Sequence, residues 1–239
     1  MNLNKTSAIA LLGLAVLVAS GTGQAAPRVE MPATIGVANY DVDGFISISG
    51  EARNTSSGWV CSPRIDVELL DAAGKLLGVQ SIFTEAKKDA GLDGGDGTYA
   101  ERVFVPPGEV AVFTYWRERS KLKGAKPASH RVKVTAGECP AARTSMQVAD
   151  IKAHHDADGF YRVRGVIKNV GAGACRSPRA VVGLYRADGK ILKAHEETPD
   201  AMFQKILKPG QTVPFEYRTL DDSKKITKSQ VWGDCNHPD

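Results

Sequence analysis

The chain contains an internal repeat. Segment 40–54 returns 115 residues later as segment 155–169, and both versions run from Asp-x-Asp-Gly-Phe to Gly-x-x-x-Asn. Met31 and Met146 keep the same offset, as do Pro63 and Pro178. A repeat of this length indicates two copies of one folding unit. Residues kept in both copies therefore point to the fold, and residues found in one copy only are the candidates for function.

Residues 1–25 have the pattern of a secretory signal peptide. Lys5 precedes an apolar run from Ala8 to Ala19, and Gly23-Gln24-Ala25 offers small residues for signal peptidase cleavage. An apolar core of about 12 residues is too short to span a bilayer. We therefore expect the mature protein to be exported, to the periplasm or the extracellular space, with no membrane span.

The charge of the chain is modest. Its formal net charge is +4, and no segment carries the strongly basic face that is typical of a nucleic-acid-binding protein. We therefore expect no nucleic-acid partner.

The four cysteines are distributed evenly between the copies. Each copy has one cysteine shortly before Ser-Pro-Arg and one at its end. In an exported protein such a set predicts disulfides, here Cys61–Cys139 and Cys175–Cys235. The alternative is Cys139–Cys175 across the junction, because a strict immunoglobulin topology puts the two cysteines of a copy at opposite ends. A zinc site is not expected, since the chain has no Cys-x-x-Cys sequence.

Apolar residues recur at every second position in short runs, such as Ile65, Val67 and Leu69. Asp43-Gly44 precedes one of these runs and predicts a hairpin turn. Phe113 and Tyr115 stand two apart, as Phe215 and Tyr217 do, so we expect each pair to face the core. The pattern predicts an all-β chain of two tandem immunoglobulin-like β-sandwich domains, residues 28–139 and 143–236.

Three motifs in each copy resemble the bacterial FxLYD-type domain. In the first copy they are Gly50-x-x-x-Asn54, Leu69-Leu70-Asp71-x-x-Gly74-Lys75 and Pro107-Gly108-x-x-x-x-Phe113. In the second they are Gly165-x-x-x-Asn169, Gly183-Leu184-Tyr185-x-x-Asp188-Gly189-Lys190 and Pro209-Gly210-x-x-x-x-Phe215. The resemblance implies a small extracytoplasmic β-sandwich that binds or spaces rather than catalyses. The cysteine pair departs from that family's pattern.

No catalytic motif is present, so we expect no catalytic residue, no metal and no cofactor. His154 and His155 are adjacent, but successive residues of a strand point to opposite faces and one metal could not take both. The two Asp-x-Asp-Gly segments resemble the start of a calcium loop but lack its later glutamate. A hairpin turn accounts for them instead.

The first copy alone carries the features that suggest recognition. Trp59 and Trp116 have no aromatic counterpart in the second copy, and Trp116 is followed by a basic segment. A tryptophan beside cations suits a glycan or an anionic partner. The predicted ligand-binding residues are Trp59, Trp116, Arg117, Arg119, Lys121 and Lys123, and we expect both tryptophans to converge at one end of the sandwich. The alternative interpretation is a solvated basic loop.

The first copy also has a 13-residue insertion, which includes the glycine-rich acidic segment 91–97. It is interpreted as a tolerated surface loop, with a flap or weak cation site as the alternative. The sequence as a whole predicts an exported, non-catalytic binding or spacer protein whose partner is an unknown protein or polysaccharide of the cell envelope. The alternatives are an accessory subunit of an envelope complex and, third, a hydrolase or metal-dependent enzyme.

Overall fold

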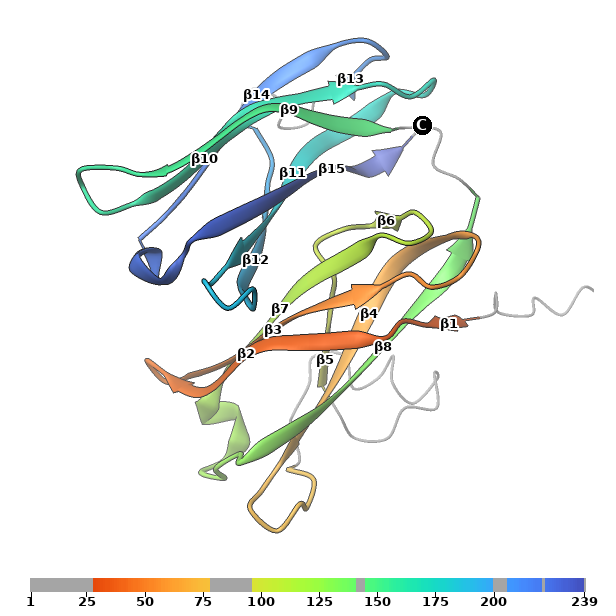
Figure 1. Ribbon diagram of the computed structural model, residues 1–239. Helices are drawn as coiled ribbons and strands as arrows, with labels where there is room; N and C mark the ends of the chain where they lie inside the picture. Colours follow the sequence, from red (N-terminus) through yellow and green to blue (C-terminus); the bar gives the residue numbers. More distant parts are fainter. Residues whose placement is uncertain (1–27, 78–95, 141–144, 200–205, 221, 239) are drawn as a thin grey trace, which may run out of the picture.

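The computed structural model describes residues 28–77, 96–140, 145–199, 206–220 and 222–238, whose regular secondary structure is almost entirely β-strand (Figure 1). The predicted all-β, sandwich-type fold is therefore confirmed. The predicted signal peptide and most of segment 91–97 lie outside these residues. Within the described ranges, no helix is long and apolar enough to cross a membrane.

The first repeat forms two antiparallel sheets. One has the strand order β1-β8-β4-β5, with β6 also paired to β4, and the other has the order β2-β3-β7. The strands are β1 (Arg28–Glu30), β2 (Ala33–Val42), β3 (Phe45–Arg53), β4 (Trp59–Leu70), β5 (Asp96–Tyr99), β6 (Phe104–Val105), β7 (Val110–Glu118) and β8 (Ser129–Cys139). A short 3₁₀ helix, η1 (Arg119–Leu122), follows β7.

The second repeat forms the equivalent pair of sheets. One has the order β14-β10-β9, and in the other β11 pairs with β12, β13 and β15. The elements are β9 (Met146–His155), β10 (Tyr161–Asn169), β11 (Cys175–Tyr185), β12 (Ile191–Glu197), β13 (Ile206–Leu207), β14 (Thr212–Thr219), the 3₁₀ helix η3 (Ser223–Lys225) and β15 (Lys228–Pro238).

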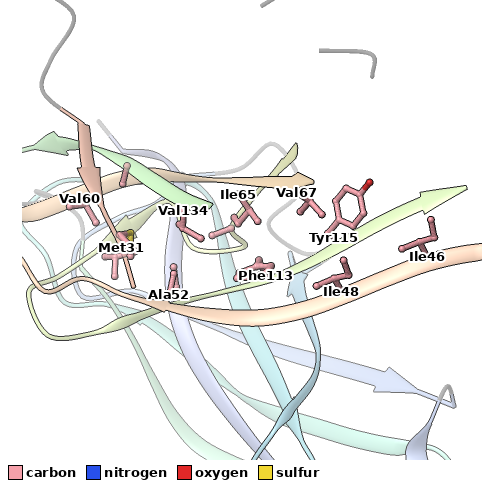
Figure 2. Close-up of a cluster of buried hydrophobic side chains, with 14 of the residues drawn as sticks. Met31, Ile46, Ile48, Ala52, Val60, Ile65, Val67, Phe113, Tyr115 and Val134 are labelled. Carbon is pink, nitrogen blue, oxygen red and sulfur yellow. The ribbon is translucent and has the colours of Figure 1, made fainter. Parts of the chain in front are cut away.

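Each repeat has an apolar core between its own two sheets. Phe113 and Tyr115 of β7 lie in the first core beside Ile48 and Val67, as Figure 2 shows. Phe215 and Tyr217 occupy the equivalent places in the second core. The prediction that both aromatic pairs face inward is confirmed, because all four side chains are buried.

The Gly-x-x-x-Asn motif shared by the repeats has a packing role. A Cβ atom on Gly50 would lie 2.5 Å from the ring of Phe113, and one on Gly165 would lie 2.8 Å from the ring of Phe215. Real Cβ atoms do not approach other carbon atoms so closely. Glycine is therefore required where each aromatic ring lies against the neighbouring strand.

The asparagine of the motif joins three segments of backbone. Asn54 donates from Nδ2 to the carbonyls of Gly58 and Val105, and its Oδ1 accepts from the backbone and hydroxyl of Ser56. Asn169 makes the equivalent bonds to Gly173, Leu207 and Gly171. Both asparagines are completely buried, so every one of these bonds replaces a lost contact with water.

Both predicted disulfides, Cys61–Cys139 and Cys175–Cys235, are confirmed, with Cα–Cα distances of 5.9 and 5.8 Å. The topological objection fails because the cysteines of each pair lie on neighbouring antiparallel strands, β4 with β8 and β11 with β15. Ser62 and Ser177, each just before a proline, have φ values of 46° and 58°. At these serines the backbone is left-handed, so each Ser-Pro-Arg segment interrupts the regular strand conformation.

The two sandwiches stack face to face rather than end to end (Figure 1). The outer face of β2-β3-β7 packs on the outer face of the sheet around β11. Val112 lies in one buried cluster with Val181, Tyr185 and Ile191. A Cβ on Gly36 would lie only 2.2 Å from the backbone oxygen of Ile191, so β2 and β12 are in close backbone contact.

Polar bonds between the repeats surround this apolar cluster. The Thr114 hydroxyl accepts from the backbone N–H of Ala194 at 2.8 Å and lies 3.3 Å from its carbonyl. The Tyr185 hydroxyl donates to Glu51 at 2.5 Å. Hydrogen bonds are directional, and these form in only one relative position of the two sandwiches. They therefore fix how one sandwich lies on the other.

Candidate functional site

Trp116 is the most exposed aromatic ring among the predicted site residues. It lies near the end of β7, and 52% of its surface is open to solvent because its neighbour Tyr115 points into the core. Its ring stacks on Phe45, with centroids 5.0 Å apart. Phe45 reaches this place because it directly follows the Asp43-Gly44 turn, which joins β2 to β3. The outward direction predicted for Trp116 is confirmed.

A hollow of about 420 Å³ opens beside this stack, at one end of the contact between the repeats. We call it the Trp116 hollow. Its lining from the first repeat is Val37, Asn39, Val42, Asp43, Phe45, Ser47, Thr114 and Trp116. Its lining from the second repeat is Leu184, Leu192, Lys193, Asp222 and Ile226. The hollow therefore exists only when the two sandwiches are stacked.

The chemistry of the Trp116 hollow is mixed. An exposed aromatic stack forms one wall, and apolar side chains such as Leu192 and Ile226 are present with it. Asn39, Ser47, Lys193 and the carboxylates of Asp43 and Asp222 supply hydrogen-bonding groups around that surface. A flat apolar platform with polar groups beside it suits a ligand that has one apolar face and a hydroxylated rim.

The predicted cations beside Trp116 are partly engaged by neighbouring acids. Arg119 is ion-paired with Asp41, and the Lys121 ammonium lies 3.8 Å from a Glu118 oxygen. Lys123 ends η1 in a left-handed conformation. Burial lowers the pKa of Arg117, and Glu118 opposes that shift. Segment 117–123 therefore does not form a basic ring around Trp116. The cation that lines the Trp116 hollow is Lys193 of the second repeat.

Trp59 lies elsewhere. It lines a second hollow of about 240 Å³, the Trp59 hollow, which shares no lining residue with the Trp116 hollow. Trp116 is opposite Ser47 on β3, whereas Trp59 follows the loop held by Asn54 at the other end of β3. Six strand residues separate these ends, roughly 20 Å at about 3.3 Å per residue. The structure thus does not bring the two tryptophans together as we expected.

The Trp59 hollow is the polar end of the contact between the repeats. Arg102 lies over the Trp232 ring at 5.6 Å and donates to Glu109 at 2.6 Å. Asp234 accepts from the backbone N–H of Val103 at 2.6 Å and from Arg179 at 3.1 Å. These side chains bind each other, which makes them a junction between the repeats rather than an open site.

A titratable group lies within this junction. Burial raises the pKa of Glu101 to about 7, and the positive charge of Arg179 opposes the rise. Burial also raises the pKa of Asp234, against the effects of Arg179 and two backbone N–H groups. The displaced carboxyl pKa values therefore belong to the contact between the repeats and not to the Trp116 hollow.

The histidine and aspartate segments considered for metals have local roles. Asp156 Oδ1 accepts from the backbone N–H groups of Asp158 and Phe160, and the Arg162 guanidinium lowers the pKa of this carboxyl by donating to it. His155 contacts the Ile226 carbonyl at 3.1 Å. Within the described ranges, no three His, Cys, Asp or Glu side chains gather closely enough to hold a metal ion.

Sequence reasoning missed half of the Trp116 hollow. Phe45 has a counterpart in Phe160, and residues kept in both copies were interpreted as part of the fold. The one signal that it could reach Trp116 was its position directly after the hairpin turn. The second-repeat residues of the hollow carried no signal, because their approach depends on the stacking of the repeats.

No family model and no curated protein matches the chain, so the FxLYD resemblance stays a prediction. Among solved structures, the chain is similar to an exo-chitosanase of Amycolatopsis orientalis, at 16% identity and a TM-score of 0.28 over 82% of this chain and 25% of that one. It is also similar to red sea bream transglutaminase, at 10% identity and a TM-score of 0.27 over 87% of this chain and 29% of that one. The chain spans about a quarter of the length of these enzymes, and likeness at this level carries no argument about activity.

Proposed function

We propose that this is an exported, non-catalytic binding protein of the bacterial periplasm or cell surface, and that it binds a glycan in the Trp116 hollow. The observation that carries the proposal is the exposed Trp116–Phe45 stack beside that hollow. A sugar can stack its apolar face on an aromatic ring, and Asn39, Ser47 and Lys193 of the same hollow offer hydrogen bonds to its hydroxyl groups.

Two features support the rest of the proposal. Two disulfides hold neighbouring strands together, and such bonds persist in oxidising compartments outside the cytoplasm. The carboxyl groups whose pKa values burial raises, Glu101 and Asp234, serve the contact between the repeats. A hydrolase would instead be expected to concentrate its perturbed groups in the ligand site.

The test is a calorimetric binding titration of the mature protein against a panel of envelope and cell-wall oligosaccharides. Trp116→Ala is expected to weaken binding about tenfold, the loss that about 1.4 kcal/mol of ring contact produces. Trp116→Phe keeps a ring and is expected to retain most of the affinity. Trp59→Ala is the matched control, and an equal loss from this variant would show that the Trp116 hollow is not the site.

A second candidate is an accessory subunit that pairs an exposed strand with another protein. The outer part of β9 is exposed on both faces, and Ile151 is 45% open. However, this strand has an irregular register and a left-handed Asp150, features by which natural edge strands resist pairing. The candidate predicts a protein that co-purifies from the cell envelope and is lost in Ile151→Asp but kept in Trp116→Ala.

A further inference from the structure

The duplication creates a second feature equivalent to the Trp116–Phe45 stack. Phe160 follows the second Asp-Gly turn as Phe45 follows the first. Arg218 lies opposite Arg162 on β10, as Trp116 lies opposite Ser47 on β3. The Arg218 guanidinium accordingly lies over the Phe160 ring, 5.5 Å from its centroid. One repeat therefore presents a ring on a ring, and the other presents a cation on a ring at the same point of the fold.

A hollow of about 440 Å³ lies beside Phe160 and Arg218, and we call it the Phe160 hollow. Two carboxylates line it, and both have partners. Glu216 accepts from Arg162 at 2.8 Å and from Arg164 at 3.0 Å. Glu197 lies 3.8 Å from His195 Nε2.

Arg218 differs from the other two arginines of this sheet. Among the described residues, no carboxylate forms an ion pair with it, while Arg162 and Arg164 share Glu216. The guanidinium carbon lies over the Phe160 ring and the Arg218 side chain is exposed, so its fork of N–H donors can reach a ligand. Such a fork matches the two oxygens of a carboxylate.

Lys193 of β12 links the two hollows, because it lines both of them. A ligand that extends from Trp116 to Arg218 would therefore pass a further cation on the way. The ends of this path differ in chemistry, with an aromatic platform at one and the Arg218 guanidinium at the other.

We propose that the ligand is a carboxylated glycan that runs from the Trp116 hollow past Lys193 to the Phe160 hollow, where Arg218 binds a carboxylate of the sugar chain. This inference rests on the proposed glycan-binding function and adds the charge and extent of the ligand. An acidic protein segment would pair with Arg218 as well, but it would make no use of the exposed Trp116–Phe45 platform.

The test compares two hexasaccharides by tryptophan fluorescence at low salt. One alternates glucuronate with N-acetylglucosamine, and the other is neutral chitohexaose. The native protein is expected to bind the carboxylated chain at least tenfold more tightly, with an advantage that shrinks as salt is added. Arg218→Ala is expected to remove most of that advantage by weakening the carboxylated chain, with a much smaller change in the affinity for chitohexaose. Arg131→Ala, a mostly exposed arginine on β8, removes the same charge and is the matched control.

The outcomes separate the two proposals. Equal binding of both chains, or equal losses in Arg218→Ala and Arg131→Ala, would overturn the carboxylate inference and leave glycan binding standing. Poly-glutamate that competes as well as the carboxylated chain, with no effect of Trp116→Ala, would identify an acidic protein partner instead. Failure of both hexasaccharides to bind would count against the proposed function itself.

Discussion

The sheet β2-β3-β7 and the sheet β9-β10-β14 are equivalent by duplication, yet the outer face of the first is buried and that of the second is exposed to solvent. Ser49, Val112 and Thr114 of the first sheet lie under the second sandwich. Arg164, Pro214 and Glu216 hold the same places in the second sheet, where the arginine and the glutamate form an ion pair that solvent reaches. The inward faces match and the outward faces do not.

Inward and outward residues of the repeat therefore have separate roles. Inward residues, such as Phe113 and Phe215, specify the sandwich and agree between copies. Outward residues determine what the sandwich meets. Small and apolar side chains let one copy bury its outer face, whereas charged side chains keep the other face in water because their desolvation is costly.

The largest effect is expected when an outward residue of the first copy is replaced by its counterpart from the second. Thr114→Glu would remove the hydroxyl bonds to Ala194 and place a carboxylate against the buried cluster around Val112. We expect the free energy of unfolding to fall by about 4 kcal/mol and the unfolding transition to divide as the sandwiches separate. Denaturant unfolding measures this change. The reverse substitution, Glu216→Thr, should cost less than about 1 kcal/mol, and similar losses from both would contradict the comparison.

Residues shared by the copies should behave alike. Asn54→Ala and Asn169→Ala each leave several buried backbone groups without a partner, so we expect each to cost about 3 kcal/mol. The measurement is thermal or denaturant unfolding of the two variants side by side. Asn39→Ala, at a position whose counterpart is His154, serves as the control. A large loss in one asparagine variant and none in the other would show that the repeats do not share this fold element.

Gly36 tests the contact between the sandwiches at a single atom. The Cβ of Gly36→Ala would lie 2.2 Å from the Ile191 backbone oxygen, and backbone cannot yield as a side-chain tip can, so we expect a loss of about 2 kcal/mol. Gly58→Ala adds the same methyl group where nothing lies within 4 Å and is the control. Equal melting temperatures for the two variants would show that the close approach of β2 to β12 does not exist in solution.

The polar junction between the repeats should make stability depend on pH. Since burial raises the pKa of Glu101 from its usual 4.5 to about 7, the folded protein holds this proton more tightly than the unfolded chain. The resulting stability is fully present below about pH 4.5 and is lost as the pH rises to about 7. Glu101→Gln is therefore expected to gain about 1 kcal/mol relative to the native protein at pH 8 and nothing at pH 4. The exposed Glu138→Gln should show no such trend in melting temperature.

Much of the fold follows from the repeat. The two disulfides and the inward aromatic pairs were predictable because each occurs in both copies, so that one copy supports the interpretation of the other. The places of Trp59 and Trp116 were not predictable, because they depend on which strand ends face the second repeat. The contacts of Gly36 with Ile191 and of Thr114 with Ala194 join residues that follow no common pattern, and the Trp116 hollow exists only through them.

The stacked arrangement has a consequence for self-assembly. The contact joins two different faces, so it is not self-complementary, and a contact of this kind can in principle repeat without end to form a fibre. The faces at the two ends of the stack carry charged side chains, Arg164 and Glu216 at one end and Glu68 and Arg131 at the other. Because burying charged side chains is costly, we expect these charges to oppose the stacking of a further unit on either end. Neutral, small substitutions on both terminal faces are therefore expected to favour polymers, which light scattering would detect.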